Sequence, residues 1–88
     1  MITTEQVNAI AAKIETMGVD EATVSVLRQD YQPLHFTYCM DDDLPNNTPI
    51  IEHKDFNLYL IDGREHCLCL TNDYEVATGI VVAEIIPE

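Results

Sequence analysis

The chain has 88 residues, of which 16 are Asp or Glu and 4 are Lys or Arg, so its formal net charge is −12. This length predicts one domain over residues 1–88 with a small core. Its acidic surface disfavours binding to nucleic acid or to anionic membranes and favours a basic partner. No stretch approaches the roughly 20 apolar residues that cross a membrane. The three cysteines, an odd number, are typical of a reducing compartment, so we expect a cytoplasmic protein.

Two helices are predicted at the start of the chain. Thr3 and Gln6 form a capping box, after which apolar residues recur at helical spacing. Gly18 ends this first helix. Asp20 caps a second helix directly afterwards, and Pro33 stops it. Because the link between them is so short, the two helices must form a corner or a hairpin.

Strand signals follow Pro33. Residues 34–40 alternate apolar with polar side chains, which predicts a half-buried strand. Residues 41–55 are predicted to be a loop, and residues 56–70 a hairpin. One or two turns of helix are predicted over residues 71–79, and a last strand over residues 80–86. The order is then α-α-β-β-β-(short α)-β. The predicted fold class is α+β, with the two N-terminal helices packed on one face of a mostly antiparallel four-stranded sheet.

The hairpin is centred on the pair Asp62-Gly63, a strong turn signal between two apolar runs. A two-residue turn at this pair would place Leu58 opposite Cys67. A three-residue loop with Gly63 as a bulge would pair Leu58 with His66 instead, and Phe56 with Leu68. This one-residue change exchanges the two faces of the second strand.

We favour the second register, because it collects Leu68 and Leu70 against the helices. The opposite face of the sheet would then be too apolar to lie fully in water, which indicates a surface for self-association or for a partner. An alternative is that the predicted loop 41–55 folds over this face. The residues expected there are Tyr59, Ile61, Cys67 and Cys69, together with His35, Cys39 and Val82.

Thiol and imidazole side chains are the residues most able to carry chemistry in this chain. As metal ligands, these side chains select zinc or iron. A Cys-x-Cys pair on a strand places both of its sulfur atoms on the same side. The alternative is that the cysteines pack as small apolar residues. The candidate ligands are His35, Cys39, His66, Cys67 and Cys69, with His53 as a further histidine.

Catalytic motifs are absent from the sequence. It contains no nucleophile elbow and no glycine-rich phosphate loop, so we expect a protein that is not an enzyme. The run Asp41-Asp42-Asp43 offers carboxylate oxygens for magnesium or calcium, but it lacks the alternate spacing of a calcium loop and also fits a solvated loop.

Four segments carry a resemblance to a known family: residues 34–39 (LHFTYC), 56–63 (FNLYLIDG), 66–68 (HCL) and 77–84 (ATGIVVAE). Through them the chain resembles an uncharacterised family of small acidic bacterial proteins, over most of its length. Such proteins tend to be encoded beside nitrogen-fixation genes. The resemblance implies a bacterial cytoplasmic setting and an accessory role, and it brings no activity, cofactor or catalytic residue.

The function expected from the sequence is that of a non-catalytic accessory protein, which binds a basic protein partner and has no bound cofactor. Homodimerisation through the open sheet face is a further expectation. The alternative is a small zinc- or iron-binding or thiol redox-sensing protein that uses the cysteines and a histidine. The residues expected to contact a partner are Asp41, Asp42, Asp43, Tyr59, Ile61 and Val82.

Overall fold

The structure is a computed structural model, and it describes residues 2–44, 48–63 and 69–85. Helix α1 (Thr4–Met17) begins at the predicted capping box. The Thr3 hydroxyl accepts from the Gln6 N–H at 3.1 Å, and the Gln6 side chain accepts from the Thr3 N–H at 3.0 Å. The helix ends at Gly18, whose φ of 102° is a conformation that favours glycine. Both predicted ends of this helix are confirmed.

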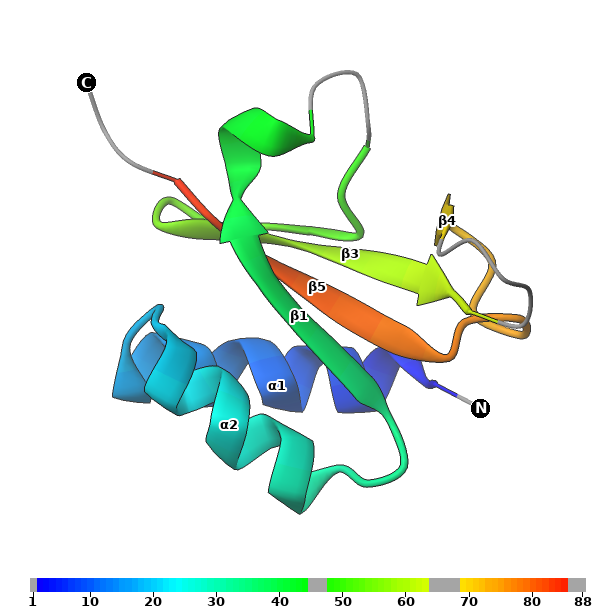
Figure 1. Cartoon of the computed structure of the whole chain (residues 1–88), viewed down its shortest axis with the longest axis horizontal. Helices are drawn as coiled ribbons and strands as arrows, with labels where there is room; N and C mark the ends of the chain where they lie inside the picture. The colour runs from blue at the N-terminus through cyan, green and yellow to red at the C-terminus, as the bar shows by residue number, and fades with distance from the viewer. Residues whose placement is uncertain (1, 45–47, 64–68, 86–88) are drawn as a thin grey trace.

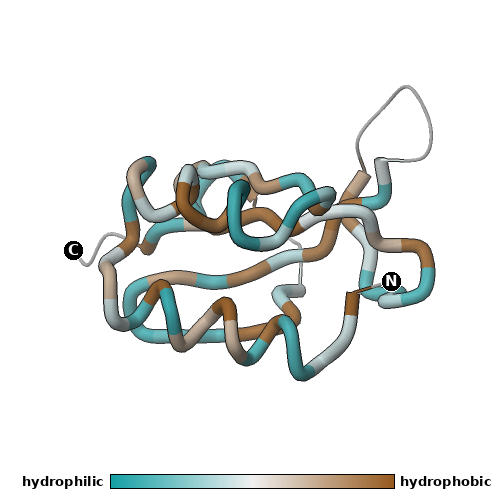
Figure 2. The backbone as a smooth tube through the Cα atoms, turned by 90° about the horizontal axis from the view of Figure 1, so that it is seen from below, coloured by the Kyte–Doolittle hydropathy of each residue, from teal (hydrophilic) through white to brown (hydrophobic). Residues whose placement is uncertain are grey.

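Helix α2 (Glu21–Asp30) begins at the predicted cap Asp20, whose carboxylate accepts from the Thr23 N–H at 2.9 Å. Both helices lie on the same side of the sheet (Figure 1). Apolar and polar residues alternate along them, as Figure 2 shows, so each helix turns an apolar stripe toward the sheet. The fully buried apolar side chains of this stripe are Val7, Ile10, Ile14, Val24 and Leu27.

A mixed sheet lies above the helices (Figure 1). Its strands, among the described residues, are β1 (His35–Met40), β2 (Ile51–Glu52), β3 (Phe56–Asp62), β4 (Cys69–Thr71) and β5 (Gly79–Glu84). The order is β1-β5-β3-β2, and β4 also pairs with β3. Strand β1 runs parallel to β5, and the other pairs are antiparallel. The predicted α+β class with N-terminal helices is confirmed, with one strand more than expected and one parallel pair.

The two faces of the sheet bury separate apolar clusters. Leu58 and Leu60 of β3, with Ile80 and Val82 of β5, lie in the helix-facing core. The residues between them point to the other face and form a smaller cluster, which contains Tyr59, Ile61, Val81 and Ala83, with Cys39, Leu44 and Leu70 packed against it. The expected positions of Tyr59, Ile61 and Cys39 on this second face are therefore confirmed.

The predicted hairpin turn at Asp62-Gly63 is wrong. Asp62 is the last residue of β3 and pairs with Cys69, a register that fits neither of the two predicted turns. Leu58 pairs with Ile51 of β2, which occupies the edge of β3 where the hairpin partner was expected. The predicted partners His66 and Leu68 lie outside the described residues. Leu70 pairs with Ile61 on the second face, and its expected place against the helices is also wrong.

The predicted position of Val82 is also wrong. It was expected on the open face, but it is 1% exposed and lies in the helix-facing core. The reason is register: Val82 pairs with Leu58, and directly paired residues share a face. Its neighbour Val81 occupies the open face instead.

Two predicted irregular segments also differ. The predicted loop 41–55 contains, among its described residues, the 3₁₀ turn η1 (Asp41–Asp43) and the short strand β2. The short helix expected over 71–79 is a set of turns, because the Asp73 carboxylate accepts from the Glu75 N–H at 2.9 Å and stabilises a turn. No helix in the described part of the chain is long and apolar enough to cross a membrane.

Candidate functional site

The turn η1 is fastened to the second face of the sheet by Asp41. One oxygen of its carboxylate accepts from the Asn57 amide at 2.9 Å and from the Tyr59 hydroxyl at 2.8 Å. Burial, followed by this hydrogen bond, raises the pKa of Tyr59. Tyr59 is only 3% exposed. Asp41 is therefore an anchor that holds the following residues over the sheet.

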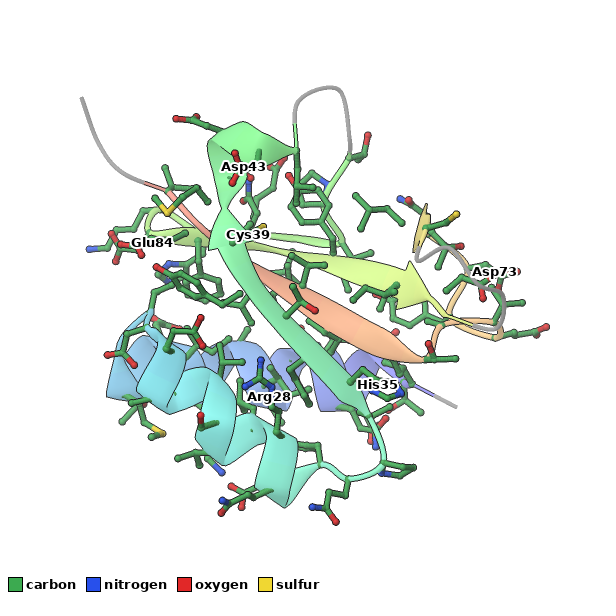
Figure 3. The ribbon with its side chains drawn as sticks, viewed as in Figure 1. Arg28, His35, Cys39, Asp43, Asp73 and Glu84 are labelled. Carbon is green, nitrogen blue, oxygen red and sulfur yellow. The ribbon has the colours of Figure 1, made fainter. Side chains whose placement is uncertain are left out.

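Beside this anchor lies a hollow of about 300 Å³, which we call the hollow throughout. It opens between β1, the end of η1, β3, β4 and β5. Ile61 and Val81 contribute from the sheet, and Leu44 and Leu70 contribute half-buried apolar side chains from the flanking segments. Its lining is completed by Thr37, Cys39, Asp43 and Cys69. Figure 3 shows Cys39 and Asp43 together at one end of β1. The result is an apolar recess with a carboxylate on its lining.

The residues expected to contact a partner are distributed unevenly around the hollow. Ile61 and Asp43 line it, and Asp43 is exposed. Asp42 is exposed but does not line it, and Asp41 and Tyr59 are used by the anchor. Unlike Ile61, Tyr59 is not part of the lining of the hollow. The predicted covering of this face by loop 41–55 therefore holds in part, because η1 lies over Tyr59 and leaves the hollow open beside it.

Sequence reasoning missed three apolar lining residues, and it also left out Thr37. Leu44 follows three aspartates in a predicted loop, where no periodic pattern marks it as apolar contact. Leu70 was assigned to the helix side by the wrong hairpin register. Val82 was predicted on the open face, which Val81 occupies instead. Strand β5 is buried on both faces, so its sequence shows no alternation that could have assigned Val81 to one of them.

The candidate metal ligands do not gather at one place in the described residues. Cys39 and Cys69 both line the hollow, whereas His35 lies at the other end of β1 (Figure 3) and lines a separate cavity. His66 and Cys67 lie outside the described residues. No group of three or more His, Cys, Asp or Glu side chains within the described ranges could hold a metal ion.

The thiol of Cys39 is held in its protonated form. Burial is the largest cause that raises its pKa, and the carboxylates of Asp43 and Asp41 add to it. The thiolate is the reactive form of cysteine, so these surroundings lower the reactivity of Cys39 near neutral pH.

His53 lies away from the thiols, on the far side of β3 from the hollow. Its ring stacks on Phe56 with 4.5 Å between the ring centres, and its Nε2 is 3.4 Å from a Glu15 carboxylate oxygen. Its Nδ1 accepts from the Asp55 N–H at 3.3 Å. These contacts fix the turn between β2 and β3 against the end of α1, which is a structural role.

Comparison with known proteins agrees with the resemblance seen in the sequence. No curated protein and no solved structure matches the chain. A family of unknown function, DUF6129, matches residues 9–85, a range that includes most of α1, all of α2 and all the strands described above. The expectation of an uncharacterised family is therefore confirmed, while the bacterial origin and the gene neighbourhood stay predictions. The chain belongs to this family of unknown function, DUF6129.

Proposed function

We propose that this chain is a non-catalytic accessory protein of the cytoplasm, and that a basic segment of a protein partner binds at the hollow. The observation that supports the proposal is an apolar recess with an exposed carboxylate, Asp43, on a chain of formal net charge −12. An apolar side chain entering the recess is stabilised by about 25 cal/mol for each Å² of apolar surface removed from water. A lysine or arginine beside it would meet Asp43.

The charge of the chain favours a basic partner over a second copy of the chain. Two copies that met at this face would bring together two chains that each carry a formal net charge of −12. A basic partner is instead attracted over distances of about 10 Å at moderate ionic strength, and salt weakens this attraction. A homodimer remains the competing occupant, and it predicts that dimerisation becomes stronger as salt is raised.

The proposal is tested with two charge-neutralising variants, Asp43→Asn and Asp42→Asn. Both remove one negative charge and both positions are exposed, but only Asp43 lines the hollow. The probe is a short fluorescent peptide that alternates lysine with valine, and binding is followed by fluorescence anisotropy at low salt. We expect Asp43→Asn to weaken binding roughly two- to fivefold, the range of one exposed ion pair, and Asp42→Asn to weaken it less.

Equal effects of the two variants would mean that the peptide senses only the overall charge. Absence of peptide binding by the unmodified chain would contradict the proposal directly. A peptide in which glutamate replaces lysine is the control for charge, and it should not bind.

A second candidate function is a small zinc- or iron-binding or thiol redox-sensing protein. The observation that favours it is that Cys39 and Cys69 line the same hollow. The raised pKa of Cys39 acts against it, because both metal binding and redox sensing use the thiolate. The interaction role is therefore the better supported of the two.

A further inference from the structure

The outer edge of β1 is a strand edge with open backbone groups. Strand β1 ends the sheet, with β5 on its inner side. The His35 N–H donates to the Thr78 carbonyl at 3.2 Å, on the β5 side. Backbone N–H and carbonyl groups alternate in direction along a strand, so those of Thr37 and Cys39 also point toward β5. The N–H and carbonyl groups of Tyr38 and Met40 point outward, away from the sheet. No described residue pairs with these outward groups.

One outward group on this edge is already occupied. The Phe36 carbonyl accepts from the Arg28 guanidinium of α2, at 3.2 Å from Nε and 3.1 Å from the terminal nitrogen. Figure 3 shows Arg28 on the helix side of β1. This contact confirms the direction of the alternation and closes the edge at Phe36. The part of the edge left for pairing is the half that ends beside the hollow.

The helix side of this edge is acidic. The Tyr38 hydroxyl donates to the Glu84 carboxylate. This hydrogen bond is the largest cause that raises the pKa of Tyr38 to about 12, followed by burial and by the charges of Glu84, Glu21 and Asp20. The Glu84 carboxylate thus contacts the side chain of Tyr38, and the charges of Glu21 and Asp20 also act on it.

The opposite side of the same edge is acidic as well. The Cys39 thiol there feels the charges of Asp43 and Asp41, the residues beside the hollow. A strand added to β1 would therefore have carboxylates near both of its faces. A second copy of the chain would bring an identical set of carboxylates against them, so a basic strand is the occupant that the charges favour.

We propose that the open edge of β1, beside Tyr38 and Met40, accepts an extended basic segment of the partner as an added strand. This inference rests on the proposed function and specifies the form of the partner segment. An added strand lies about 4.8 Å from β1, and its side chains alternate between the two faces. Side chains on one face would reach the hollow past Cys39, and those on the other would meet Glu84. The segment is therefore expected to alternate apolar residues, which enter the hollow, with basic residues, which meet Glu84, and to carry a further basic residue beside the hollow at Asp43.

Amide hydrogen exchange with the lysine–valine peptide tests the pairing. We expect the peptide to slow exchange at Met40, whose N–H points outward, and at Tyr38 by the same reason. Exchange at Thr37 and Cys39 should not change, because their N–H groups already pair with β5. Binding without slower exchange at Tyr38 and Met40 would overturn the added strand and leave the proposed function standing. No binding at all would overturn both.

Proline at position 40 gives an independent test. Met40 has a φ of −87°, close to the range that proline adopts, and it ends β1, where a preceding extended residue is already in place. Met40→Pro therefore removes one outward N–H with little strain at this position. We expect it to weaken peptide binding roughly fivefold or more, the worth of about one hydrogen bond. Met40→Leu, which keeps the N–H, is the matched control, and equal binding by the two variants would overturn the inference.

Discussion

Replacing Leu58 by alanine is expected to lower the free energy of unfolding by about 2–5 kcal/mol, the range for truncating a buried leucine. Leu58 is fully buried in the helix-facing core and lies on β3, an interior strand that pairs with both β5 and β2. Because small domains are stable by only about 5–15 kcal/mol, this one change removes a large share of the total. Urea unfolding followed by circular dichroism measures the loss.

Leu70→Ala is the matched control, since it removes the same atoms on the opposite face. Leu70 is half-buried and lines the hollow. Leu70→Ala should lower the free energy of unfolding by about 1 kcal/mol or less, as for other partly exposed positions. A loss at Leu70 as large as that at Leu58 would show that the main core does not lie on the helix side of the sheet.

Gly79→Ala is expected to destabilise the chain by about 1–3 kcal/mol through overpacking. A Cβ at this position would lie 2.4 Å from the His35 carbonyl oxygen and 2.9 Å from the His35 Cβ. The clash involves backbone, so rotation of a side chain cannot relieve it. Gly79 pairs with His35 at the start of the parallel β1–β5 ladder, and we expect faster amide exchange at Thr37 and Cys39.

Gly18→Ala provides the comparison for this prediction. A Cβ at Gly18 would meet only the Asp20 side chain, at 4.0 Å, but the φ of 102° is strained for alanine. Its cost is therefore local backbone strain of roughly 1–3 kcal/mol at the end of α1. In the Gly18→Ala variant, amide hydrogen exchange at Thr37 and Cys39 should change only as much as the global free energy of unfolding changes. If Gly79→Ala and Gly18→Ala give the same exchange pattern in β1, the parallel pairing at Gly79 is contradicted.

The two helices were predictable because their signals are local. The Thr3 capping box, Gly18 and the Asp20 cap each act within about one turn of chain, so the sequence holds all the information that these ends need. The alternation in residues 34–40 placed β1 correctly for the same reason, with Phe36 in the core and Cys39 on the other face. The α+β class follows from these elements.

The sheet register could not be read locally. Asp62-Gly63 has the composition of a tight turn, but β3 continues through Asp62 because β2 and β4 divide its outer edge between them. The pairing of β1 with β5 joins residues more than forty positions apart, as with His35 and Gly79. Leu44 lies over the sheet next to the Asp41 anchor, a contact between segments far apart in the sequence. The hollow depends on all three of these contacts, so its lining was only partly predicted.

The most direct test of the proposed function is a titration of methyl-labelled protein with the lysine–valine peptide, followed by nuclear magnetic resonance. We expect the methyl signals of Leu44, Leu70 and Val81, which line the hollow, to shift with a common Kd. Those of Leu27 and Leu58 in the helix-facing core should stay in place. Shifts confined to other surfaces, or none at all, would contradict the assignment of the hollow as the site where a basic partner binds.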